Sequence, residues 1–139
     1  MYSATYPIAE ERQTTKGRRW TGLALSGIAI LFLLFDSLGK LLKVAPVVEG
    51  TAQLGYPEGA IVPIGVILLL CVVTYVVPRT AILGAVLLTA YMGGAIATHV
   101  RVGSPLLTHV LFPVYVSVLV WLGLYLRDPR VGASLSNHQ

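Results

Sequence analysis

Residues 20–42 read WTGLALSGIAILFLLFDSLGKLL, a run that carries no charged side chain before Asp36. An α-helix rises about 1.5 Å per residue and the core of a bilayer is about 30 Å thick, so about 20 apolar residues are enough to cross it. Because lipid offers no hydrogen-bond partner to the backbone, a run of this length is expected to be helical. The sequence therefore predicts a membrane-spanning helix over residues 20–42.

Three further apolar runs of similar length follow, over residues 59–77, 80–100 and 106–126. The chain of 139 residues is 55% hydrophobic and only 12% charged, against roughly 25% charged residues in soluble proteins. This balance excludes a disordered chain and a nucleic-acid-binding module, and it makes the lipid bilayer the expected partner. We therefore predict an all-α fold, a bundle of four transmembrane helices.

The basic residues divide unequally between the two ends of such a bundle. Three lie at one end, and these are Lys40, Lys43 and Arg101. Seven lie at the end that carries both termini, and these are Arg12, Lys16, Arg18, Arg19, Arg79, Arg127 and Arg130. The positive-inside rule then places both termini in the cytoplasm. We expect a basic cytoplasmic segment over 1–19, the membrane domain over 20–127, and a polar cytoplasmic tail over 128–139.

A cleaved signal peptide is disfavoured at the N-terminus. The first apolar run is long, it carries Asp36 and Lys40 near its end, and it lacks a small-x-small cleavage site. We expect the run to stay in the protein as its first spanning helix.

The first helix carries an acid and a base in its extracytoplasmic half. Asp36 precedes Lys40 by four residues, which is the favourable order for an ion pair along one helix face. Ionisable groups at membrane depth are costly unless they are paired or hydrated, so they indicate a functional site by default. The alternative is a pair that only neutralises itself at the interface.

Further polar side chains belong to the same half of the bundle. Tyr91 and His99 share one face of the third helix by its helical spacing. His99 and His109 lie on either side of the break at residues 103–105, so an antiparallel hairpin brings them to a similar depth. We predict a polar cleft at this end, lined by Asp36, Lys40, Tyr91, His99, Arg101 and His109.

Two histidines are weak evidence for a metal or a haem. The chain has no Glu-x-x-His motif and no haem-attachment motif, and its one cysteine, Cys71, lies in an apolar run. We therefore expect no intrinsic cofactor and no metal site, and haem or metal held by His99 and His109 is disfavoured. Hydrogen bonding and proton exchange are the alternatives for this pair.

Small residues recur at a spacing of four in the third predicted helix, where Ala90 precedes Gly94 and Gly93 precedes Ala97. This spacing lets helix backbones approach closely. The contact is either inside the bundle or between two copies, and we expect a homo-oligomer.

Several short segments follow one another in a recognisable order: FDSLGKL at 35–41, LGYP at 54–57, VPR at 77–79, and YMGGA at 91–95 running into TH at 98–99. Over about residues 20–127 they resemble the DoxX-like family of small four-helix membrane proteins. The resemblance implies a membrane protein associated with oxidoreductase systems, because the family is named after a subunit linked to thiosulfate oxidation with electron transfer to quinone. The positions that carry over are Asp36, Lys40, Tyr56, Pro57, Thr98 and His99.

Three functions remain open. The first is a bacterial inner-membrane protein whose cleft binds a small hydrophobic, quinone-like molecule and serves a membrane oxidoreductase partner. The second is a small enzyme that uses His99 or His109 for acid–base chemistry, with Asp36 setting the protonation state. The third is a structural or assembly subunit without a ligand. The full set of predicted ligand-binding residues is Asp36, Lys40, Tyr56, Tyr91, Thr98, His99, Arg101 and His109.

Overall fold

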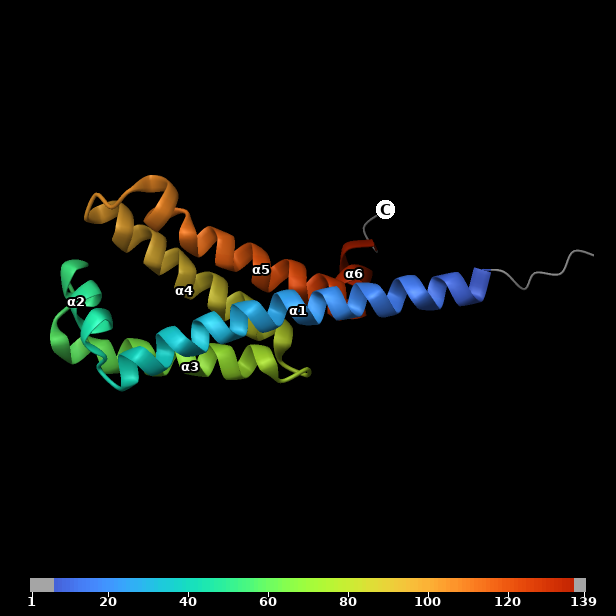
Figure 1. The fold of residues 1–139 in the computed structure, drawn as a ribbon, viewed down its shortest axis with the longest axis horizontal. Coiled ribbons are helices and arrows are strands. Elements are labelled where there is room, and N and C mark those ends of the chain that lie inside the picture. The colour runs from blue at the N-terminus through green and yellow to red at the C-terminus, as the bar shows by residue number, and fades with distance from the viewer. Residues whose placement is uncertain (1–6, 137–139) are drawn as a thin grey trace, which may run out of the picture.

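The computed structural model describes residues 7–136, and every regular element in that range is a helix (Figure 1). In chain order the elements are α1 (Pro7–Leu41), α2 (Ala45–Gln53), α3 (Glu58–Val76), α4 (Ala81–Arg101), the π-helical turn η1 (Leu106–Val110), α5 (Phe112–Arg127) and α6 (Pro129–Ser136). The all-α prediction is confirmed.

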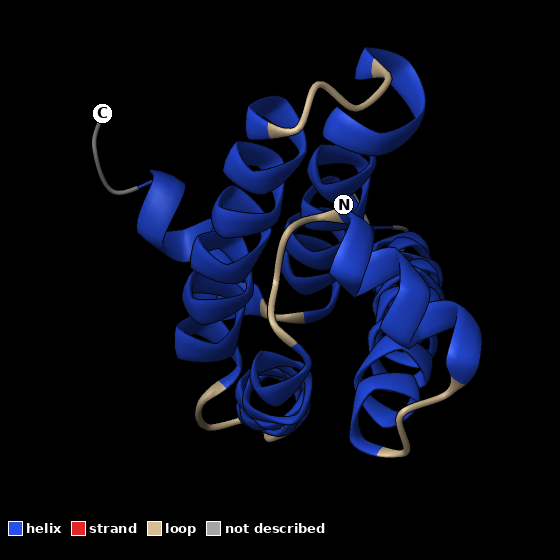
Figure 2. Ribbon diagram, turned by 90° about the vertical axis from the view of Figure 1, so that its left-hand side faces the viewer, coloured by secondary structure: helices blue, strands red, loops and turns tan. Residues whose placement is uncertain are grey.

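Four segments are long and apolar enough to cross a bilayer: Lys16–Leu41, Glu58–Val76, Ala81–Arg101 and Leu106–Arg127. They agree with the four predicted spans to within a few residues. Figure 2, which looks along the bundle, shows them arranged around a common centre. α1 packs against α3 and α5, and α4 packs against the same two helices, so each spanning helix has two neighbours.

Three short segments are helical where the sequence predicted none. α1 begins at Pro7, so the basic segment over 1–19 is not separate from the first span in the described range. α2 occupies the connection between the first two predicted spans, and α6 lies in the predicted tail over 128–139. In α2 and α6 a proline stands at the start, where its fixed φ and missing N–H suit a first turn.

The start of α6 is held by an ion pair. Arg130 Nη2 lies 2.6 Å from Asp128 Oδ2, and the Arg130 backbone N–H also donates to Asp128. The hydrogen bond from the Arg130 side chain holds the pKa of the Asp128 carboxyl below its ordinary value. The pair is therefore intact at neutral pH, and α6 folds back beside the end of α5.

The fourth span is interrupted just before Pro113. η1 ends at Val110, α5 begins at Phe112, and Pro113 lies in the first turn of α5. A proline cannot donate to the carbonyl four residues before it, so the hydrogen-bond ladder of a continuous helix loses a bond at this point. The interruption turns η1 away from the axis of α5.

Tyr75 joins three helices in the core. Its side chain is fully buried, and its hydroxyl donates to the Val120 carbonyl of α5 at 2.8 Å. The same hydroxyl lies 2.8 Å from Ser26 Oγ of α1, which therefore acts as the donor to it. A buried hydroxyl with both partners in place links α1, α3 and α5 at one depth.

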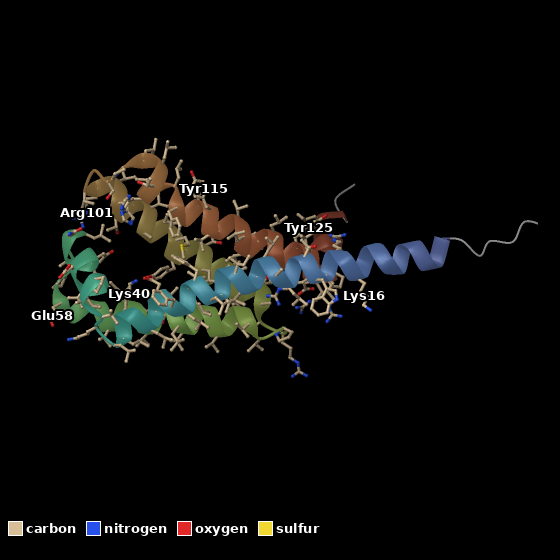
Figure 3. All side chains as sticks on the ribbon, in the orientation of Figure 1. Lys16, Lys40, Glu58, Arg101, Tyr115 and Tyr125 are labelled. Carbon is tan, nitrogen blue, oxygen red and sulfur yellow. The ribbon has the colours of Figure 1, made fainter. Side chains whose placement is uncertain are left out.

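Tyr75→Phe is expected to lower the free energy of unfolding by about 1–2 kcal/mol, because it removes both hydrogen bonds of the buried hydroxyl and leaves the Ser26 hydroxyl without this partner in the core. The change is measured by thermal or denaturant unfolding in detergent. Tyr115→Phe is the matched control, since Tyr115 is 49% exposed on the outer face of α5 (Figure 3). Equal effects of the two substitutions would contradict this role for Tyr75.

Candidate functional site

A cavity of about 820 Å³ lies at the end of the bundle that carries α2. Its wall is formed by the second half of α1, by α2, by the first half of α3, by the second half of α4, and by η1 with the start of α5. Lys40 and Arg101 mark this end in Figure 3, whereas Lys16 and Tyr125 mark the opposite end. The cavity is therefore confined to one half of the molecule.

The wall has an apolar part and a polar part. The apolar side chains include Phe32, Leu33, Ile64, Ile67, Met92, Phe112 and Val116. The polar side chains are Asp36, Lys40, Thr51, Gln53, Tyr56, Tyr91, Thr98, His99, Ser104 and His109. A large apolar surface with a few convergent polar groups is the usual composition of a small-molecule site.

The predicted ion pair forms on this wall. Lys40 Nζ lies 2.5 Å from Asp36 Oδ1, and the Asp36 side chain is 32% exposed against 11% for Lys40. α3 approaches α1 closely here, since a Cβ placed on Gly65 would lie 2.9 Å from Lys40 Cβ. Packing fixes the lysine stem, and the carboxylate remains the more accessible partner.

His99 and His109 lie close together, as the short break at residues 103–105 between their helices predicts. Their ring centroids are 5.7 Å apart, with the ring planes at 63°. The turn between them is tight, because Gly103 adopts a φ of 72° and the Ser104 N–H donates to the His99 carbonyl. Such a φ favours glycine, which explains the glycine at this position.

Each histidine is oriented by a neighbouring hydroxyl. His99 Nδ1 lies 3.1 Å from Ser104 Oγ, and His109 Nδ1 lies 2.7 Å from Thr108 Oγ1. With Nδ1 engaged in this way, Nε2 is the ring atom that each histidine can offer to a ligand. The pair thus supplies two imidazole groups to one wall of the cavity.

Tyr56 and Thr98 connect the loop before α3 with α4. Thr98 Oγ1 donates to the Gly94 carbonyl at 2.9 Å, so the Tyr56 hydroxyl, 3.0 Å away, donates to Thr98. Tyr91 lies about two turns before Thr98 on the same wall, and it is partly buried against the core. These three residues place hydroxyl groups at two levels of the cavity wall.

Arg101 differs from the other predicted residues because it does not line the cavity. Its Nη2 donates to the Leu54 carbonyl at 2.7 Å, and its guanidinium covers Gly55. It therefore links the end of α4 to the end of α2, and it supports these two parts of the cavity wall without lining the cavity itself. The structure brings the remaining seven predicted residues together around one cavity.

Sequence reasoning missed the contribution of α2 and of the turn before η1. Thr51, Gln53 and Ser104 line the cavity but were not predicted. No hydrophobic period marks α2 in the sequence, so its side chains could not be assigned to a face. Ser104 is separated from His99 by five residues, and a hydroxyl so close to a predicted site histidine was the available signal.

The cavity wall brings two imidazole groups together, but no third metal-ligating side chain among the described residues joins them. Among the residues that the structure describes, no three His, Cys, Asp or Glu side chains come close enough to hold a metal ion jointly. Asp36 is engaged with Lys40, and Cys71 is buried in the core on α3. The arrangement offers hydrogen-bond donors and acceptors to an organic molecule.

Four spanning helices around a partly polar cavity define a small multi-pass membrane protein. A family model described as the DoxX-like family matches residues 24–123, which include all four spans in large part. The chain belongs to the DoxX-like family. Comparison with curated proteins gave no match, and comparison with solved structures gave none either.

Proposed function

We propose that the cavity binds a small amphipathic molecule of the quinone type and that the protein serves a membrane redox system. The observation that carries the proposal is the composition of the 820 Å³ cavity, whose apolar wall is combined with the Asp36–Lys40 pair and the two histidines. Sites for small organic ligands have volumes of about 300–1,000 Å³. Membership of the DoxX-like family supports this ligand class, because the family is named after a subunit linked to electron transfer to quinone.

The chemistry of the wall suits a quinone in particular. A quinone ring presents two carbonyl acceptors on a flat apolar ring, and its tail is soluble in lipid. Lys40, a histidine Nε2–H and the Tyr91 hydroxyl are donors of the kind that such carbonyls accept from. Phe32, Ile67 and Phe112 offer apolar surface to the ring and the tail.

We also propose the membrane in which the protein lies and its orientation there. Both termini would face the cytoplasm of a bacterial cell, since most basic residues lie at the end of the bundle with α6. The cavity then opens toward the extracytoplasmic side of the inner membrane. Cysteine labelling of residues introduced at Glu58 and at Arg79 in intact cells tests this orientation.

The experiment is a titration of purified protein in detergent with a short-chain ubiquinone, together with mass spectrometry of lipids and quinones that copurify. His99→Ala is expected to weaken binding about tenfold by removing one polar contact, and Asp36→Ala by a similar factor because it releases the Lys40 ammonium that Asp36 holds in place. Arg79→Ala is the control, because Arg79 lies in the connection between α3 and α4 at the other end. Unchanged affinity in both cavity variants would overturn the proposal.

The acid–base enzyme is less well supported by the contacts. Asp36 is bonded to Lys40, while His99 and His109 are bonded to hydroxyl groups, so the observed contacts do not couple the acid to either imidazole. A purely structural subunit does not account for a cavity of this size. Binding is therefore the function that the site favours.

A further inference from the structure

We propose a second site, for the phosphate of an anionic lipid headgroup, at the opposite end of the bundle. A cavity of about 380 Å³ lies there between the first half of α1, the connection from α3 to α4 with the start of α4, and the junction of α5 with α6. Its wall consists of Arg19, Leu23, Pro78, Ala81, Arg127, Asp128, Pro129 and Arg130.

The charges on this wall are unbalanced. It carries three arginines and one aspartate, and Asp128 is engaged by Arg130, which also donates to the Pro78 carbonyl. The Arg19 side chain is exposed, and it forms no hydrogen bond or ion pair within residues 16–135, the range over which the structure describes side chains. With one aspartate against three arginines, and that aspartate paired directly with Arg130, the wall keeps an excess of positive charge at Arg19 and Arg127.

Arg127 is the central residue of this site. Its Nη2 donates to the Tyr75 carbonyl at 3.3 Å, and its guanidinium lies 4.9 Å from the centre of the Tyr75 ring. Both partners are neutral, and Arg127 Nε is buried without a hydrogen-bond partner among the described residues. The guanidinium is held in one orientation by neutral partners, so its Nη groups are preorganised for a phosphate, which arginine binds through parallel N–H donors.

The depth of the site matches a lipid headgroup. Arg127 ends the fourth span, Arg19 lies in the first turns of the span Lys16–Leu41, and Pro78 lies between the second and third spans. Basic pockets between transmembrane helices at this level bind anionic headgroups. Leu23 is exposed on the same wall and offers apolar surface to the glycerol and the start of an acyl chain. We therefore assign the phosphate to a lipid rather than to a free ion.

Binding is tested on the full chain in detergent, by native mass spectrometry and by thermal shift with added phosphatidylglycerol or phosphatidylcholine. The protein is expected to retain phosphatidylglycerol preferentially, and Arg19→Gln to reduce its apparent affinity about fivefold. Arg127→Gln is expected to reduce it at least as much. Because Arg127 also packs on Tyr75, the exposed Arg19 gives the result that does not depend on folding.

Arg79→Gln is the matched control, since it removes the same charge at the same end of the bundle from a residue outside the cavity wall. An equal loss in Arg79→Gln and Arg19→Gln would overturn the site in favour of diffuse surface charge. Equal retention of both lipids by the wild-type chain would overturn it as well. Stabilisation by millimolar inorganic phosphate equal to that by phosphatidylglycerol would reject the lipid as the source.

Discussion

Gly84→Ala is expected to destabilise the protein by more than about 3 kcal/mol, because a methyl group at this position has no space. A Cβ on Gly84 would lie 2.2 Å from the Tyr75 backbone nitrogen and 2.3 Å from its Cα. These are backbone atoms of α3, so a side-chain rotation cannot relieve the overlap. α3 and α4 would have to separate at the point where Tyr75 joins three helices.

The control variant, Gly93→Ala, is expected to change the stability in the opposite direction. Gly93 also lies in α4, but nothing is found within 4 Å of the position that its Cβ would take. Replacing a helical glycine by alanine stabilises an unobstructed helix by about 0.5–1 kcal/mol. Thermal unfolding of the two variants in the same detergent is the measurement. A Gly84→Ala variant as stable as Gly93→Ala would contradict the observed packing of α3 on α4.

Gly94→Trp is expected to weaken binding of a short-chain ubiquinone at least about tenfold by obstructing the large cavity. Gly94 lies on the cavity wall, and a Cβ there meets no atom within 4 Å. The indole ring would extend into the space between α4 and the Asp36–Lys40 pair on α1. Because the site is open at this position, the bundle itself is expected to fold normally.

Gly93→Trp separates obstruction from a general effect of a bulky residue in α4. Gly93 is adjacent in sequence, has the same open surroundings, and does not line the cavity. Titration with the quinone should give wild-type affinity for Gly93→Trp and a large loss for Gly94→Trp. Equal affinities in the two variants would mean that the ligand does not occupy this cavity.

The spans and the polar wall could be predicted from the sequence because each depends on a local rule. Apolar runs of sufficient length must be helical in lipid, and residues four apart on a helix must meet, as Asp36 and Lys40 do. A short connection between antiparallel helices brings its flanking residues together, which accounts for His99 and His109.

The remaining features depend on contacts that the sequence does not specify. The small residues of α4 were predicted to pack either inside the bundle or against a second copy, and inside the bundle it is Gly84 that approaches Tyr75 closely, whereas a Cβ on Gly93 or Gly94 would meet no atom within 4 Å. Which small residue meets a neighbour depends on the rotation of α4 in the bundle. Arg101 was predicted to line the cleft, but its partner, the Leu54 carbonyl, lies in a connection whose path follows from α2.

Photoaffinity labelling in native membranes tests the central claim most directly. An azido-quinone is added with and without an excess of unlabelled quinone, and the modified residues are mapped by peptide mass spectrometry. The account predicts competed labelling on the cavity wall, within residues 32–40 of α1, 90–99 of α4 and 104–116 around η1. Labelling confined to lipid-facing residues such as Leu70 and Val86, and insensitive to competitor, would contradict it.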